Sequence, residues 1–261
     1  AVIIFFVLSG FIIYYSTTSR ASSWQQYAVA RLSRIYSVTL PAVLLSVVLA
    51  LWLGSQHGFD STKFSNYSPP AVWDTISTLL FLNESWMNDV DLTMNNPYWS
   101  LNYEVWFYVM FGAFYFGGTR WRWWLVGVAA LIAGPAILVL QPIWLLGAWL
   151  AASGRHATRW TAGRAWLVFL GTVALIVLIN TSDADRLMQS YLYENVSGFW
   201  RLDGSQRFIT DYLIGLALCL HIAAYSSLPV TVQDFFARHQ GLFATLAGFS
   251  FTLYLFHRPM T

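Results

Sequence analysis

A single carboxylate interrupts a run of aromatic and aliphatic residues, WSLNYEVWFYVMF, at 99–111. In a helix that begins near Trp99, spacings of i, i+4 and i+8 place Ser100, Glu104 and Tyr108 on one stripe. Exposing a carboxylate to lipid is costly, so Glu104 is predicted to face a protein interior or a water-filled cavity. Apolar neighbours should raise its pKa, which suits a group that transfers protons at neutral pH. The alternative is a structural carboxylate paired with an arginine of another helix.

Arginines near the N-terminus could bind a different part of a substrate. Arg31 and Arg34 share a helix face at i, i+3, and Arg20 follows the first apolar run. Guanidinium groups bind phosphates through paired hydrogen bonds, so the three could hold a phosphate-rich cytoplasmic donor such as an acyl-coenzyme A. The alternative is that they fix the membrane topology or contact anionic lipids.

A third polar stripe lies near the end of the chain. Ser250, Tyr254 and His257 follow at i, i+4 and i+7 on an otherwise apolar helix. A histidine can act as a base at physiological pH, which makes His257 a catalytic candidate, although a lone histidine near a helix end also serves as a cap. The other histidines lack the spacing of a zinc site and the sequence has one cysteine, Cys219, so no metal is expected.

The composition places the elements that carry these residues in a membrane. The chain has 261 residues, of which 57% are hydrophobic, 18% aromatic and 10% charged. A soluble domain has about 25% charged residues, whereas a lipid-facing surface must be apolar. The net charge of +2 and the scattered basic residues argue against a nucleic-acid partner. The expected partner of the chain's surface is therefore the lipid bilayer.

The predicted fold is an all-α, polytopic bundle of transmembrane helices. Seven apolar windows are long enough to span a bilayer, namely 1–17, 35–54, 99–117, 123–140, 165–180, 207–225 and 241–257. The shorter segment 142–152 is predicted to be an eighth span that begins at Pro142, because proline is favoured in the first turn of a helix. Residues 71–82 are too short to cross and are predicted to form an interfacial or re-entrant helix.

Loop charges set the predicted orientation. If eight spans alternate, the arginines near the N-terminus and those between 120 and 164 share one side, which is then cytoplasmic. The long loops 55–98 and 181–206 would be extracytoplasmic. Both are rich in Asn, Asp, Ser and Tyr, which suits a polyhydroxyl ligand, although surface loops often have this composition. The sequence begins inside an apolar run without the features of a signal peptide, so further residues are expected upstream.

Four segments of the sequence together resemble one family. They fall in the order and spacing of the acyltransferase-3 family, multi-pass bacterial membrane proteins that O-acylate glycans and related acceptors, and they read FFVLSGFII (5–13), ARLSRIY (30–36), PYWSLNYEVWFYVMF (97–111) and SFTLYLFHRP (250–259). The resemblance covers nearly the whole chain. It implies one membrane-embedded acyltransferase domain over 1–261, belonging to a bundle of about ten helices in the intact family.

The resemblance also implies a reaction and its residues. An acyl group, above all acetyl, would pass from cytoplasmic acyl-coenzyme A to a hydroxyl of a cell-surface glycan or lipid-linked sugar at the bacterial inner membrane. The three N-terminal arginines would bind the donor, with Glu104 in the core of the site and His257 as a further catalytic candidate. The side chains expected to bind substrate or line the site are Ser100, Asn102, Tyr108 and Tyr254.

Two departures from the family pattern keep other functions open. Ser37 stands where the family usually has proline. The family's expected base, a histidine that follows an arginine on an earlier helix, has no counterpart in 1–261, so this stretch would lack that helix and the catalytic histidine. The first alternative function is a proton-coupled transporter or flippase with Glu104 as the coupling group. The second is an inactive membrane scaffold.

Overall fold

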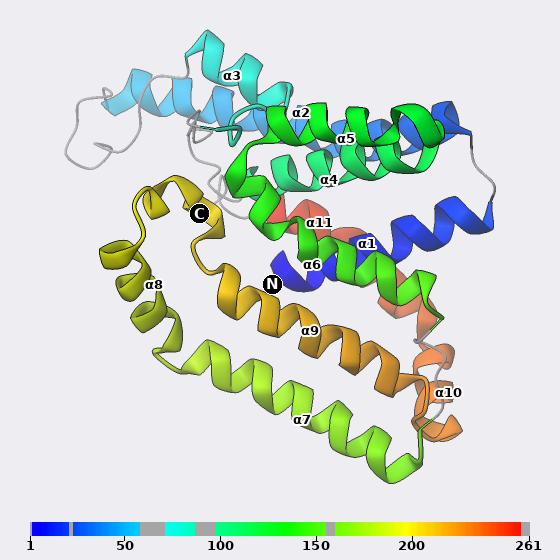
Figure 1. Ribbon diagram of the computed structural model, residues 1–261. Coiled ribbons are helices and arrows are strands. Elements are labelled where there is room, and N and C mark those ends of the chain that lie inside the picture. Colours follow the sequence, from blue (N-terminus) through cyan, green and yellow to red (C-terminus); the bar gives the residue numbers. More distant parts are fainter. Residues whose placement is uncertain (1, 21–22, 58–70, 87–97, 155–159, 257–261) are drawn as a thin grey trace. The chain divides into compact units, whose positions relative to one another are not determined.

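The computed structural model describes residues 2–20, 23–57, 71–86, 98–154 and 160–256 (Figure 1). All regular elements within these ranges are helices, which confirms the all-α prediction. Five of the described helices are long and apolar enough to cross a membrane: α1 (Val2–Ser19), α2 over Trp24–Gln56, α6 (Pro135–Ala152), α7 (Ala162–Thr181) and α9 (Phe208–Tyr225). The chain is therefore a multi-pass membrane protein.

The predicted number of eight spans is not confirmed. Helix α5 (Gly118–Ala133) has 16 residues and helix α11 (Gln240–Phe256) has 17, which is short for a span of the usual width. Helix α4 (Trp99–Phe116) has 18 residues but carries Asn, Glu and many aromatic side chains, and it is not among the five helices above. The short helix predicted within 71–82 is present as α3 (Val72–Leu79).

Helix α6 corrects the prediction that Pro142 begins a helix. Pro142 lies inside α6, and the break between α5 and α6 falls at Gly134. Gly134 has φ = +86°, a left-handed conformation that favours glycine. A methyl group at this position would also approach the Trp86 backbone nitrogen to 2.7 Å. Pro135 then occupies the first turn of the new helix, where its missing N–H costs nothing.

Two segments are more helical than the sequence indicates. Helix α2 (Trp24–His57) runs without a break for 34 residues, although only 35–54 were predicted as a span. The predicted outer loop 181–206 contains helix α8 (Ala184–Asn195) and the 3-10 helix η3 (Phe199–Ser205). Polar residues suggested a loop there, but Ala, Arg, Leu, Met, Gln and Glu are all good helix formers.

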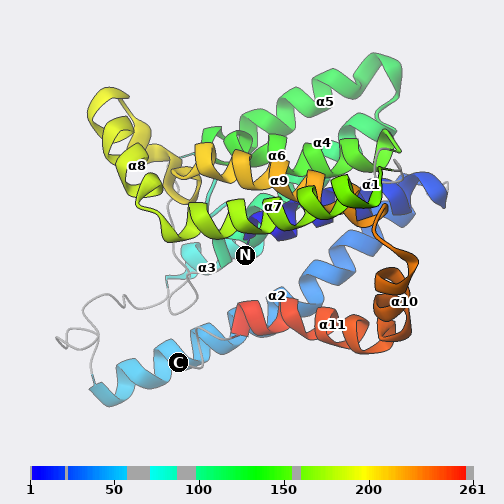
Figure 2. The same ribbon diagram turned by 90° about the horizontal axis from the view of Figure 1, so that it is seen from below.

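The helices group into two compact units, and the first comprises residues 1–22 and 138–243. Within it, α7 and α9 lie side by side along most of their length (Figures 1 and 2). Helix α1 also contacts α9, and the short helix α10 (Val230–Arg238) follows α9. A methyl group on Gly10 would overlap the Trp144 backbone carbonyl, so this glycine permits the close helix packing expected of small residues.

The second unit comprises residues 23–137 and 244–261 and contains the polar stripe of α4. Helix α4 packs closely against α5, and it also contacts α2. Two hydrogen bonds fix α4 from different neighbours. The Tyr27 hydroxyl donates to the Tyr108 backbone oxygen at 3.0 Å, and the Trp106 indole donates to the Phe81 backbone oxygen at 2.8 Å.

Candidate functional site

The polar side chains of α4 are buried. Glu104 is 2% exposed and Asn102 is 0% exposed, and Ser100 and Tyr108 are buried with them. This position agrees with the high cost of turning a carboxylate toward lipid. The Tyr108 hydroxyl donates a hydrogen bond to a Glu104 carboxylate oxygen one helical turn away. Two members of the stripe predicted from the i, i+4 spacing, Glu104 and Tyr108, are therefore joined by a hydrogen bond.

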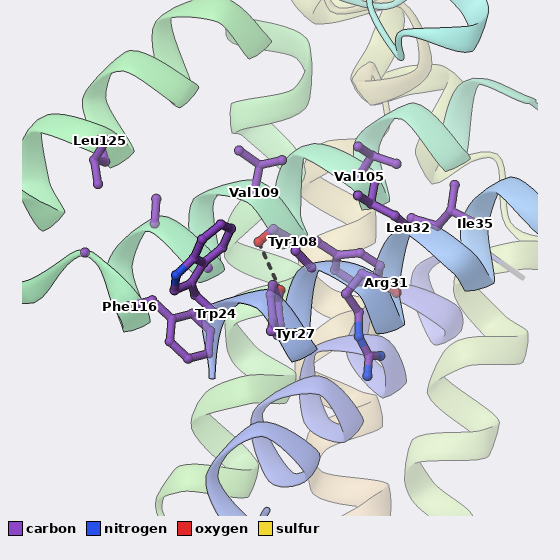
Figure 3. A pocket seen from close by; sticks show the side chains of 14 residues that line it. Trp24, Tyr27, Arg31, Leu32, Ile35, Val105, Tyr108, Val109, Phe116 and Leu125 are labelled. Carbon is purple, nitrogen blue, oxygen red and sulfur yellow. Dashed lines mark hydrogen bonds between the residues drawn. The ribbon is translucent and has the colours of Figure 1, made fainter. Parts of the chain in front are cut away.

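A cavity of about 400 Å³ lies beside this pair, within the second unit (Figure 3). Its wall is almost entirely apolar and aromatic, and it is formed by residues of α2 and α4, with Gly117 and with Leu125 of α5. Tyr27 and Tyr108 both line it, and they are joined by the bond from the Tyr27 hydroxyl to the Tyr108 backbone. Gly112 leaves room for the Tyr27 ring, because a methyl group there would lie 3.0 Å from its Cε1 atom.

Tyr108 connects Glu104 to the cavity. The Tyr108 side chain forms part of the cavity wall, while its hydroxyl bonds to the Glu104 carboxylate. A phenol and a carboxylate in contact can share or pass on a proton. The arrangement can therefore couple a proton at Glu104 to a reaction at the cavity wall.

Arg31 supplies a positive charge to the same cavity. It lines the cavity, and its guanidinium carbon lies 5.9 Å from the centre of the Tyr27 ring, within the range of a cation–π contact. Its Nε atom is buried and has no hydrogen-bond partner among the described residues. A phosphate or carboxylate group is the natural partner for such a donor.

The other predicted residues are distributed differently. Arg34 is exposed and does not line the cavity, and Arg20 is exposed and belongs to the first unit. His257 and the side chain of Tyr254 lie outside the described part of the structure. Among the described residues no group of three or more His, Cys, Asp or Glu side chains could hold a metal. Of the predicted site residues, Arg31 and Tyr108 line the cavity, and Glu104 is hydrogen-bonded to Tyr108.

The structure contains a second polar cluster, which the sequence did not predict. The Asn102 side-chain nitrogen donates to the Asn83 side-chain oxygen at 2.9 Å, and the Asn83 nitrogen donates to a Glu84 carboxylate oxygen at 3.1 Å. Asn83 and Glu84 are both buried, although they were predicted to lie in an outer loop. Nothing in their local sequence marks them as buried except the aromatic residues Phe81 and Trp86 on either side.

The backbone that carries this cluster is strained. Phe81 and Trp86 have φ values of 56° and 57°, which bulky residues rarely adopt and which cost on the order of 1–3 kcal/mol each. Contacts of the two side chains stabilise these backbone conformations. The Phe81 ring stacks on Tyr98 at 6.2 Å, and the Trp86 indole donates to the Leu131 backbone oxygen. We refer to residues 81–86 as the Phe81–Trp86 loop.

Tyr98 anchors the same region from the start of α4. Its hydroxyl donates to the Thr78 backbone oxygen at 2.9 Å, and the Tyr36 hydroxyl donates to the Leu79 oxygen at 2.9 Å. Burial raises the pKa of the Tyr98 phenol above its ordinary value, so the phenol stays protonated and remains a donor. The end of α3 is thereby fixed on both α2 and α4.

Comparison with known proteins identifies the family of the chain. The family model of the acyltransferase-3 family, described as an acyltransferase domain, matches residues 1–261. Searches of the curated proteins and of the solved structures gave no significant match. The match extends over every motif on which the resemblance was based. The chain therefore belongs to the acyltransferase-3 family and is an acyltransferase with membrane-spanning helices.

Proposed function

We propose that the protein moves an acyl group, in the first instance acetyl, from cytoplasmic acyl-coenzyme A to a hydroxyl of a cell-surface glycan or lipid-linked sugar. One observation supports this most strongly. The buried Glu104 carboxylate is bonded to Tyr108, whose side chain lines a cavity that Arg31 also lines. A proton-handling pair and a phosphate-binding group thus border one apolar space. The bacterial inner membrane is the proposed location, because the donor is cytoplasmic and the acceptor faces outward.

Arg31 would bind the donor in this reaction. Its guanidinium group can donate charge-assisted hydrogen bonds to a phosphate of the coenzyme A, which also gives its buried Nε atom a partner. The apolar wall of the cavity suits the uncharged thioester end of the same molecule. The donor would then lie with its charged part at Arg31 and its reactive carbonyl toward Tyr108.

The transfer requires one proton to leave the acceptor. The acceptor oxygen attacks the thioester carbonyl carbon, the carbon–sulfur bond breaks, and the hydroxyl proton ends on the coenzyme A sulfur. A positioned base contributes about 10²- to 10⁴-fold to such a step. The resemblance expects that base to be a histidine on an upstream helix, with His257 as a second candidate. Glu104 would orient the base or relay the proton through Tyr108.

Loss of the Glu104 carboxylate tests this proposal. In membranes that contain the protein expressed from its complete gene, labelled acetyl should pass from acetyl-coenzyme A to membrane glycan. Glu104→Gln keeps the side-chain shape but cannot hold the proton, so transfer should fall at least about 10²-fold with the amount of folded protein unchanged. The matched control is Glu194→Gln, which changes an exposed glutamate of α8.

Other outcomes would favour the alternatives. Flux of a substrate across sealed vesicles, driven by a proton gradient and abolished in Glu104→Gln without any acetyl transfer, would indicate a transporter or flippase. Absence of both coenzyme A binding and transfer in the complete protein would indicate an inactive scaffold.

A further inference from the structure

A second cavity, of about 470 Å³, lies within the first unit, at the end of α7 and α9 where α10 follows (Figure 1). Most of its lining residues carry aromatic rings. The Phe236 and Phe243 rings lie 5.4 Å apart, and the Tyr225 ring meets Phe236 edge-on at 5.7 Å. Among the described residues, no Asp, Glu, Lys or Arg lines this cavity. Its walls therefore suit a flat, uncharged ring.

His221 lines the cavity in a single tautomer. Its Nδ1 atom lies 2.9 Å from the Thr172 hydroxyl, and that hydroxyl donates its only hydrogen to the Phe169 backbone oxygen at 2.9 Å. Thr172 must therefore accept from His221, so the neutral imidazole carries its hydrogen on Nδ1 and a lone pair on Nε2. The imidazole also stacks on the Phe169 ring, with the ring centres 4.0 Å apart. The cavity wall thus contains a fixed hydrogen-bond acceptor.

Tyr225 and Gln240 add two further polar groups to the same wall. The phenol can donate and accept a hydrogen bond, and the amide has two donor hydrogens and an acceptor oxygen. A lipid chain would match the aromatic walls but leave these groups without partners. A flat heterocycle with donors and acceptors around its edge matches both the walls and the polar groups, because aromatic side chains stack on its faces.

The tautomer of His221 indicates which heterocycle fits. Its Nε2 lone pair requires an N–H donor on the edge of the ring, which the 6-amino group of adenine supplies and a carbonyl group does not. An amide side chain such as that of Gln240 can bond the 6-amino group and the adjacent N7 atom of adenine together. The amino group has two hydrogens, so one can reach the Gln240 oxygen and the other the His221 nitrogen.

We propose that this cavity binds an adenine base. The loop charges predict that this end of α7 and α9 is cytoplasmic, where adenine nucleotides occur. Arg164 in the first turn of α7 and Arg238 at the end of α10 are close in the chain to lining residues, and they can pair with the phosphate of a nucleotide. The base can belong to a free nucleotide or to coenzyme A, and the second source rests on the function proposed above.

The test compares two nucleosides on the protein from its complete gene, reconstituted in phosphatidylcholine nanodiscs. Adenosine has the 6-amino group and purine riboside lacks it, and saturation-transfer NMR with competition titrations gives both affinities. We expect the unaltered protein to bind adenosine about 3- to 10-fold more tightly. His221→Asn keeps a donor toward Thr172 but has no acceptor in place of Nε2. The preference for adenosine should disappear in this variant, whereas binding of purine riboside should hardly change.

Gln240→Leu is a second variant, at an exposed position where folding tolerates the change. It should weaken adenosine about tenfold and purine riboside less, because only adenosine offers the amino group as well as N7. The matched controls are His239→Asn and Gln25→Leu, which alter exposed residues that do not line the cavity. Both controls should keep the affinities of the unaltered protein. Thermal unfolding of each variant shows that the comparison is made on folded protein.

Three results would overturn the adenine site. The first is that neither nucleoside binds the unaltered protein. The second is that the preference for adenosine persists in both His221→Asn and Gln240→Leu. The third is that 1-naphthol, a flat ring with a hydroxyl donor, displaces adenosine at lower concentration than AMP does, which would indicate a site for phenols.

Competition distinguishes the two sources of the base. Displacement of adenosine by coenzyme A, but not by 4′-phosphopantetheine, would assign the site to the acyl donor. Displacement by AMP without displacement by coenzyme A would assign it to a free nucleotide, and either result supports the adenine site. Adenosine binding in a protein that transfers no acetyl would count against the proposed function and leave the adenine site intact.

Discussion

Two carboxylates in each compact unit have partners of different kinds. In the first unit, Asp185 forms an ion pair with Arg207, and the exposed Asp183 lies 3.5 Å from Arg186. In the second unit, Glu104 accepts a hydrogen bond from a phenol and Glu84 accepts one from an amide. The two partners in the first unit are cations, whereas the two in the second unit are uncharged donors. The function proposed above assigns proton handling to the second unit.

The largest expected effect tests whether the phenol partner of Glu104 is functional. Tyr108→Phe removes the hydroxyl that meets the carboxylate but keeps the ring in the cavity wall. Acetyl transfer should fall by about 10- to 10²-fold, because the proton path loses one member. Initial rates in membranes, normalised to folded protein, measure this.

Tyr115→Phe is the control for that change, because Tyr115 lies on the same helix with an exposed side chain. Equal rates for Tyr108→Phe and the unaltered protein would show that Glu104 works without its phenol. The contrast between phenol-bonded and arginine-bonded carboxylates would then have no catalytic meaning.

The next largest effect is expected when the positive charge at the cavity is removed. Arg31 lines it and Arg34 does not, although the sequence alone treats the two as equivalent. Arg31→Gln should raise the KM for acetyl-coenzyme A by about tenfold or more, since charge-assisted hydrogen bonds to a phosphate are lost. Arg34→Gln should raise it by a smaller factor. Steady-state kinetics with varied donor provide the measurement, and a larger effect from Arg34 would contradict the assignment.

The smallest effect is expected for the ion pair of the first unit, Asp185 with Arg207. Asp185→Asn weakens the pair with Arg207, in which the arginine side chain is 45% exposed. The free energy of unfolding should fall by only about 0.5–1 kcal/mol, because solvent screens such pairs. Acetyl transfer per folded molecule should not change. A loss of activity at unchanged stability would show that this carboxylate also takes part in the reaction.

Local patterns predicted much of the fold. The spans near 1–17, 165–180 and 207–225 match α1, α7 and α9 within a few residues, because a long apolar run has few alternatives in a membrane. The contact between Glu104 and Tyr108 follows from helical spacing once α4 begins at Trp99. These features depend on neighbours within one or two turns, which the sequence displays directly.

The features that the sequence did not predict depend on distant contacts. Proline is compatible with the first turn of a helix and is also found inside membrane helices, so Pro142 alone could not locate the break. Gly134 ends α5 in a conformation shaped by Trp86, far away in the chain. Buried Asn83 accepts a hydrogen bond from Asn102 of α4, which lies 19 residues away in the chain. Of the donor arginines, Arg31 was distinguished only by the packing of α2 on α4.

The length of α2 has a consequence for how a charged molecule could reach this site. At 34 residues the helix is about 51 Å long, against about 30 Å for the hydrocarbon layer. If its most apolar part, 35–54, crosses the hydrocarbon layer, the turns that carry Tyr27 and Arg31 lie outside that layer. The charged part of an acyl-coenzyme A could then remain hydrated while it binds near Arg31. Only its uncharged tail would have to cross from water into the protein.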